Sequence, residues 1–162
     1  MELSNGKLGL IDYGQTKRLD AQSCQLLART VSMLGDNKIQ SDQVAQSMRA
    51  LGFQTKKDDA EMLVRYAKLF FDSDMEARKW GCATPQEYLL KLAELDPLEK
   101  VPDSAGRHSL LMKASCTSHL CVKVFVARTS FLFRGMGSLV NEQVETAKRW
   151  KKHAKAALLA PA

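Results

Sequence analysis

The chain has 162 residues, a length that suits one domain or part of a larger one but not two ordinary domains. Its composition, 45% hydrophobic and 26% charged, is typical of a folded soluble chain and excludes disorder over most of its length. Charged residues interrupt the most hydrophobic region, Leu120 to Val140, so no conventional transmembrane helix is expected.

The net charge of +6 is distributed unevenly along the chain. From Ser104 to Ala162 there are ten Lys or Arg residues and two acids, whereas the preceding 103 residues have fourteen and sixteen. The two parts are therefore about +8 and −2, and an anionic partner is expected to meet the C-terminal part. Four scattered cysteines argue against a disulfide-rich secreted scaffold, and no targeting segment is visible.

The first predicted element is a short strand that follows a tight turn. Asn5-Gly6 is a strong hairpin signal, and Lys7 to Asp12 has the alternating pattern of a strand. Only Met1 to Ser4 remain to form the partner strand, so the chain is expected to begin inside a hairpin.

From Asp20 onward the periodic signals are helical, because apolar residues recur three and four positions apart. The first three helices are expected to start at Asp20, at Ser41 and at Thr55, the last in a capping box with Asp58. The first helix should bury Leu27, Val31 and Leu34 and end at Gly35. The second should bury Val44, Met48 and Leu51 and end at Gly52. The third should bury Met62, Leu63, Tyr66, Leu69 and Phe70.

The clearest helix start is Thr84-Pro85-Gln86-Glu87, which combines an N-cap, a proline at the first helical position and a glutamate that reaches back. Asp96-Pro97 should end this helix, and the stretch from there to Arg107 is predicted to be a loop. A long helix from about Ser109 into Phe133 and a last helix from Asn141 should follow. The long helix is expected to be interrupted near Gly135 and Gly137. The expected buried residues of the helix that starts at Thr84 are Tyr88, Leu89, Leu92 and Leu95, and those of the last helix are Ala147, Trp150, Ala154 and Leu158.

The sharpest chemical motif is Asp12-Tyr13-Gly14, at the end of the predicted strand. Protein kinases use an Asp-aromatic-Gly sequence in this position: the carboxylate ligates Mg²⁺ at the nucleotide phosphates, and the glycine permits the backbone to reverse. Asp and Gly are also common at ordinary strand ends, so a simple turn is the alternative explanation of the tripeptide alone.

The surroundings of this motif favour the kinase interpretation. Ile11 to Gln15 is followed by Lys17-Arg18-Leu19 and, after a helical region, by a segment from Arg128-Thr129 to Arg134-Gly135-Met136-Gly137. In these stretches the sequence resembles the UbiB/aarF family of atypical kinase-like proteins. The resemblance implies a mainly α fold, the partial large lobe of a protein-kinase-like fold, with a short N-terminal strand or hairpin followed by about six helices.

The resemblance also implies how the chain is organised and which residues handle the nucleotide. Residues 1–20 would form the strand and loop, 21–103 the helical part of the large lobe, and 104–162 a basic helical part of the same domain. Asp12 would ligate Mg²⁺, Tyr13 would be the aromatic residue of the loop, and Gly14 its hinge. The complete parent protein would use ATP and Mg²⁺ to support coenzyme Q or other isoprenoid-lipid metabolism, with a mitochondrial or plastid location.

These 162 residues contain neither the family's small lobe nor its His-Pro-Gly-Asn catalytic loop, since none of the three histidines is followed by proline. Phosphoryl transfer depends on ATP held between two lobes and two metal-binding groups. We therefore expect a C-terminal fragment that is inactive alone and binds neither ATP nor Mg²⁺ tightly.

Two further groups of residues resemble functional sites less closely. Cys116, His119 and Cys121 would not converge on one face of a helix and lack a fourth ligand, so reduced core thiols explain them better than a metal site. Gly135-Met136-Gly137 lacks the third glycine and the preceding strand of a dinucleotide fingerprint, so we expect a helix break there.

The basic segment Lys148 to Lys155 is amphipathic, with Trp150 on its apolar side. It fits the solvated outer face of a kinase-like lobe, or an anionic membrane surface with the tryptophan at the headgroups. Nucleic acid is the least favoured partner, because a single tryptophan offers little stacking surface. The alternative to the kinase-like interpretation is a non-enzymatic helical adaptor that docks on an anionic membrane or an acidic partner. A truncated lobe should also expose apolar surface, which predicts self-association.

Overall fold

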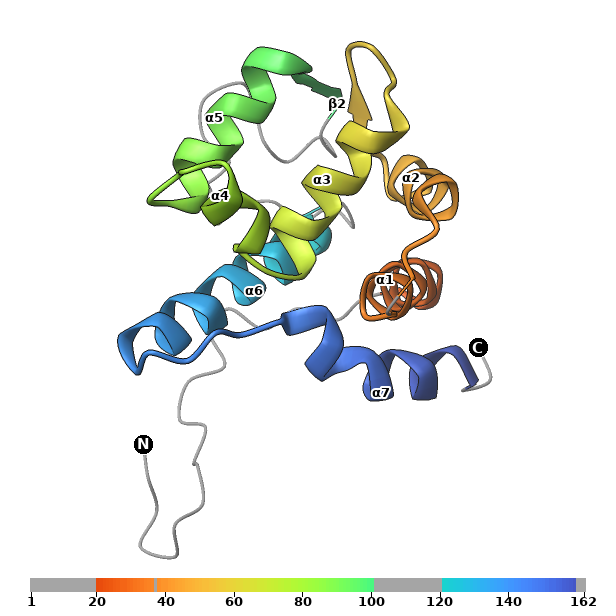
Figure 1. Cartoon of the computed structure of the whole chain (residues 1–162). Helices are drawn as coiled ribbons and strands as arrows, with labels where there is room; N and C mark the ends of the chain where they lie inside the picture. The colour runs from red at the N-terminus through yellow and green to blue at the C-terminus, as the bar shows by residue number, and fades with distance from the viewer. Residues whose placement is uncertain (1–19, 37, 101–120, 160–162) are drawn as a thin grey trace, which may run out of the picture.

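The computed structural model describes residues 20–36, 38–100 and 121–159. They form a mainly helical domain of seven helices with a small two-stranded antiparallel sheet (Figure 1). The helices are α1 (Ala21–Leu34), α2 (Ser41–Ala50), α3 (Ala60–Phe71), α4 (Met75–Lys79), α5 (Pro85–Leu95), α6 (Cys121–Leu139) and α7 (Thr146–Leu159), and the strands are β1 (Gln54–Thr55) and β2 (Leu98–Lys100). Within these ranges no helix combines the length and the apolar composition needed to span a bilayer.

Helix α3 is the centre of the domain, in contact with α1, α2, α4, α5 and α6 (Figure 1). Its apolar face is buried as the sequence predicts, and an aromatic cluster forms around Phe70. The ring centroid of Phe70 lies 5.6 Å from that of Phe53, before α3, and 6.4 Å from that of Phe131 in α6. Tilted and edge-on arrangements of this kind are favourable for aromatic pairs, so the cluster joins α6 to the core.

Helices α1 and α7 share the most extensive contact between two elements. The Asp20 carboxylate caps α1 by accepting a hydrogen bond from the Ser23 backbone N–H at 2.8 Å, and Gly35 follows its last residue, as predicted. A Cβ atom at Gly35 would lie 2.9 Å from the carbonyl oxygen of Ala147, so the absence of a side chain there lets α7 approach. Lys151 of α7 then pairs with Asp36 at 2.5 Å.

The predicted capping box of Thr55 and Asp58 is wrong. Thr55 belongs to β1 and pairs with Leu98 of β2. Helix α3 starts after Asp59, whose carboxylate accepts a hydrogen bond from the Glu61 backbone N–H at 2.8 Å. Asp58 has a φ of 53°, a left-handed conformation that separates the strand from the helix. The stretch after Pro97, predicted to be a loop, accordingly begins with a strand.

The start and the end of α5 agree with the sequence prediction. The Thr84 hydroxyl oxygen accepts a hydrogen bond from the Glu87 backbone N–H at 3.2 Å, and the Glu87 carboxylate accepts one from the Ala83 N–H at 2.7 Å. Asp96 follows the last helical residue. Of the residues expected to be buried in this helix, Tyr88 and Leu92 are buried, Leu89 is half-buried and Leu95, in the last turn, is exposed.

The long helix is not broken at its glycines. Helix α6 continues through Gly135 and Gly137 to Leu139, which corrects the prediction of a break. The last helix starts at Thr146 rather than at Asn141, whose φ of 57° marks the turn between α6 and α7. The short helix α4 has no counterpart among the predicted elements. The predicted start of α6 near Ser109 lies outside the described residues.

Candidate functional site

The three residues predicted to handle Mg²⁺ and ATP, Asp12, Tyr13 and Gly14, lie outside the described residues, so their roles stay predictions. The same holds for Cys116 and His119 of the rejected metal motif. The structure does describe the second stretch of the resemblance, Arg128 to Gly137, which is part of α6.

Arg134 is a buried cation where α6 meets α3 and α4. Its Nη2 atom donates a hydrogen bond to the carbonyl oxygen of Leu69 at 2.7 Å, and its Nη1 atom lies 3.4 Å from the Asp74 carboxylate. The guanidinium carbon lies 4.5 Å from the ring centroid of Phe131, a cation–π distance. Burial lowers the pKa of Arg134, and the charges of Asp74 and Asp72 oppose that shift. The guanidinium group of arginine loses its proton only far above neutral pH, so Arg134 stays charged.

The pairing of Arg134 with Asp74 is looser than a hydrogen bond. The Nε and Nη1 atoms of Arg134 and the Oδ1 atom of Asp74 are all buried and have no hydrogen-bond partner within the described part of the chain. Removing one member of a buried ion pair leaves the other charge buried and unpaired, which strongly lowers the stability of the fold. The geometry therefore identifies Arg134 as an anchor of α6, and sealed donor atoms of this kind are not open to a ligand.

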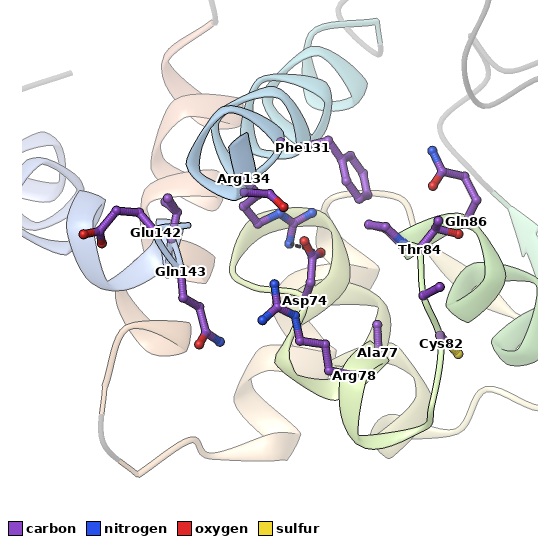
Figure 2. Close-up of a pocket in the computed structure, with 15 residues that line it drawn as sticks. Asp74, Ala77, Arg78, Cys82, Thr84, Gln86, Phe131, Arg134, Glu142 and Gln143 are labelled. Atoms are coloured by element: carbon purple, nitrogen blue, oxygen red, sulfur yellow. Dashed lines mark ion pairs between the residues drawn. The ribbon is translucent and has the colours of Figure 1, made fainter. Parts of the chain in front are cut away.

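A cavity of about 280 Å³ lies beside this anchor, between α4, the start of α5, α6 and residues 142–144 (Figure 2). Figure 2 shows Asp74 directed toward Arg134, with Arg78 on the opposite side of Asp74. The charged lining residues are two cations, Arg78 and Arg134, and two acids, Asp74 and Glu142, so their formal charges cancel. A polyphosphate would meet two carboxylates here, and the cavity therefore does not suit ATP.

This cavity also lacks a catalytic constellation. No histidine lines it, and its one thiol, Cys82, is buried with its sulfur 3.8 Å from the carbonyl oxygen of Trp80. No group of three or more His, Cys, Asp or Glu side chains is placed to hold a metal ion in the ranges that the structure describes. Around this cavity the described residues thus form a polar lining and a buried arginine anchor, and they do not pair a nucleophile with a neighbouring base.

The basic C-terminal segment forms a cationic surface on α7. Lys148, Arg149, Lys152 and Lys155 are exposed, although Lys148 also pairs with Glu145 at 3.0 Å. Trp150 is half-buried instead of free, because its ring packs edge-on against Phe133 with centroids 6.1 Å apart. The cations are therefore available to an anionic surface, while the tryptophan already has a protein partner.

Sequence reasoning missed two residues that organise this region. Asp72 holds the start of α7, but its partners lie far along the chain, and no local signal indicates the contact. Arg134 was noticed only as part of a motif. The small residues Ala127, Ser130 and Gly137 share a face of α6 with it, and that spacing is a signal that would have predicted a packed face around a buried cation.

Comparisons of the chain with protein-family models, curated proteins and solved structures find no match. The UbiB/aarF resemblance accordingly rests on the two sequence stretches alone.

Proposed function

We propose that this chain carries the helical part of the large lobe of a UbiB/aarF-like atypical kinase or ATPase, in which Asp12 ligates the Mg²⁺ of bound ATP. The observation that carries the proposal is the sequence Ile11-Asp12-Tyr13-Gly14-Gln15 followed by Lys17-Arg18-Leu19. The mainly helical architecture of the described residues supports it, since a large lobe of this kind is built from helices after the metal-binding loop.

The second stretch of the resemblance supports the proposal in a different way. Arg134 bonds the carbonyl of Leu69 and faces Asp74, and Gly137 lets residues 142–144 approach the helix. Two of the four positions of the Arg-Gly-Met-Gly pattern, Arg134 and Gly137, therefore have a structural role. The proposal gives this stretch no part in phosphoryl transfer.

The chain alone is proposed to be catalytically silent, since phosphoryl transfer requires groups that these 162 residues do not contain. The parent protein is proposed to use ATP in coenzyme Q or isoprenoid-lipid metabolism in mitochondria or plastids. A calorimetric titration of this chain with ATP and Mg²⁺ should show no tight binding, and tight binding would contradict this part of the proposal.

The family assignment itself has a separate test. The coding sequence upstream of Met1 should encode an in-frame His-Pro-Gly-Asn loop, and the protein made from the extended frame should hydrolyse ATP in a Mg²⁺-dependent way. Asp12→Asn in that protein should abolish the activity, because it removes a metal ligand. The matched control is Asp42→Asn, at an exposed position in the first turn of α2, which should leave activity unchanged. An upstream sequence without such a loop, or an Asp12→Asn protein that stays active, would contradict the family assignment.

A second candidate function is a non-enzymatic adaptor that docks on an anionic membrane, and the exposed cations of α7 favour it. Flotation of the chain with vesicles of anionic or neutral phospholipid tests this role. Lys152→Glu with Lys155→Glu should abolish binding to anionic vesicles, while Lys56→Glu, at an exposed position directly after β1, should not. Absence of binding to either vesicle removes this candidate.

A further inference from the structure

Helix α6 is packed with its large apolar side chains outward. The residues on its buried face are small or polar: Ala127, Ser130, Arg134 and Gly137. Four large apolar residues lie on its exposed face, and a fifth follows in the turn just after it; together we call them the α6 stripe: Leu132, Phe133, Met136, Leu139 and Val140. They follow one another at i, i+1, i+4, i+7 and i+8, the spacing of a single helical face. A helix that is apolar on its outer side is normally covered.

The α6 stripe is large enough to form the core of a protein interface. Leu139 is 85% exposed and Val140 is 68% exposed, and the other three side chains are between 45% and 59% exposed. At roughly 150–200 Å² for a whole side chain of this size, the five expose on the order of 500 Å² together. A standard interface buries about 800 Å² on each partner, so the stripe supplies more than half of what is needed.

The composition of the stripe indicates its partner. Arg134 is the one charged residue between Thr129 and Asn141, and it points into the domain. Helices that lie on bilayers carry several Lys and Arg residues along the border of their apolar face, whereas the exposed face of α6 has one, Arg128, a turn before Leu132. A charge-free centre of aromatic, Met and Leu side chains is characteristic of contacts between proteins. The uncharged apolar side chains of the stripe can pack against the same side chains of a second copy. A two-fold symmetric contact between two copies is therefore the simplest contact that covers the stripe.

Two details of the structure prepare this face for another helix. Phe133 is held edge-on by Trp150, so one member of the stripe is fixed before any partner arrives. Gly135 adjoins the stripe and has no packing reason to be glycine, since a Cβ atom there would meet nothing within 4 Å. We propose that two copies of this chain associate through the α6 stripe in a symmetric dimer. This inference is independent of the kinase-like assignment.

Analytical ultracentrifugation over a range of concentrations tests the proposal on the whole chain. The wild-type chain should show a monomer–dimer equilibrium, and Met136→Glu should weaken the dimer about ten-fold or more by placing a charge at its centre. Leu139→Glu, at the most exposed position of the stripe, is a second variant with still less contact to the core. Leu90→Glu is the matched control, because Leu90 is a leucine of α5 that is 65% exposed, away from the stripe.

Circular dichroism melts of each variant establish that the helices are retained. A wild-type chain that is monomeric at every concentration overturns the proposal, and so does a dimer that both glutamate variants leave intact. Equal weakening by Leu90→Glu would also overturn it, because the contact would then not be specific to α6. A monomer whose binding to anionic vesicles is abolished by Met136→Glu would assign the stripe to a bilayer instead.

Discussion

The carboxylate of Asp72, at the end of α3, accepts a hydrogen bond from the backbone N–H of Ala147 in α7, 3.3 Å away. The backbone carbonyl of Asp72 accepts a second hydrogen bond, from the N–H of Thr146 at 2.9 Å. The first N–H groups of a helix have no partner within the helix itself. The residue that follows α3 therefore satisfies two of these donors and determines where α7 begins.

The charge of Asp72 should make the stability of the domain depend on pH. Burial is the main cause that raises the pKa of its carboxyl above 3.8, while the Ala147 N–H and the Arg134 charge lower it. A raised folded-state pKa means that the stabilising contribution is fully present below the unfolded pKa and is lost as pH rises through the folded pKa. Asp72→Asn keeps an acceptor oxygen and cannot ionise, so it should gain stability relative to wild type as pH rises.

Urea unfolding of both proteins at about pH 3.5 and about pH 7 measures this difference. Asp42→Asn, at an exposed position, provides a control for the general effect of removing one negative charge. An Asp72→Asn protein that loses stability relative to wild type as pH rises would show that the bond to Ala147 outweighs the cost of burial.

Removing the buried anchor of α6 should strongly destabilise the domain. Arg134→Met leaves the Leu69 carbonyl and the partly buried Asp74 carboxylate without their cation, and we expect a loss of about 3 kcal/mol. Arg149→Met removes an exposed arginine of α7 and should change stability by less than about 0.5 kcal/mol. The free energies of unfolding come from urea titrations. Similar losses in the two variants would contradict the anchor role.

Two glycines of α6, two positions apart, should respond oppositely to the same substitution. A Cβ atom at Gly135 meets nothing within 4 Å, so Gly135→Ala should stabilise the helix by about 0.5–1 kcal/mol. A Cβ atom at Gly137 would clash with the Val144 side chain and lie 2.8 Å from the Glu142 carbonyl oxygen. Gly137→Ala should therefore lower the melting temperature, although alanine has a higher helix propensity than glycine. A higher melting temperature for Gly137→Ala would refute the close approach.

The hydroxyl groups of Thr30 and Ser47 join α1 to α2 through a buried contact of 2.6 Å. The Thr30 hydroxyl also donates to the Leu26 carbonyl at 2.9 Å, so Ser47 must be the donor between the two hydroxyls. Thr30→Val leaves the Ser47 hydroxyl buried without an acceptor and should cost about 1–2 kcal/mol. Ser47→Ala leaves the Leu26 bond intact and should cost less. The double variant should lose less than the sum of the two, as a double-mutant cycle would measure.

Helix starts with a nearby cap could be predicted from the sequence. The Asp20 carboxylate accepts from an N–H three residues on. At the start of α5 the Thr84 hydroxyl accepts from the Glu87 N–H and the Glu87 carboxylate accepts from the Ala83 N–H, so the information is local. Thr55 followed by Asp58 has the same local pattern and was assigned wrongly. Its backbone instead pairs with Leu98, and a partner so far along the chain leaves no trace in the surrounding residues.

The glycines of α6 show a second limit of local patterns. Gly135 and Gly137 predict a break, but packing keeps the helix continuous, with residues 142–144 against Gly137. Arg134 similarly resembles an ordinary surface charge until its bond to Leu69 is seen. At the candidate site, the motif and the family resemblance together predict that Asp12 ligates Mg²⁺. It lies outside the described residues and stays a prediction.

The contact between α1 and α7 has a consequence for how the protein is made. A ribosome releases α1 early, but the helix that covers it most extensively is synthesised after all the other described elements. The apolar side of α1 stays open to solvent or to a chaperone through most of translation, since contacts between distant segments are formed last. Productive folding of this domain is thus tied to the synthesis of α7, and translation stalled before Thr146 should yield an aggregation-prone, protease-sensitive product.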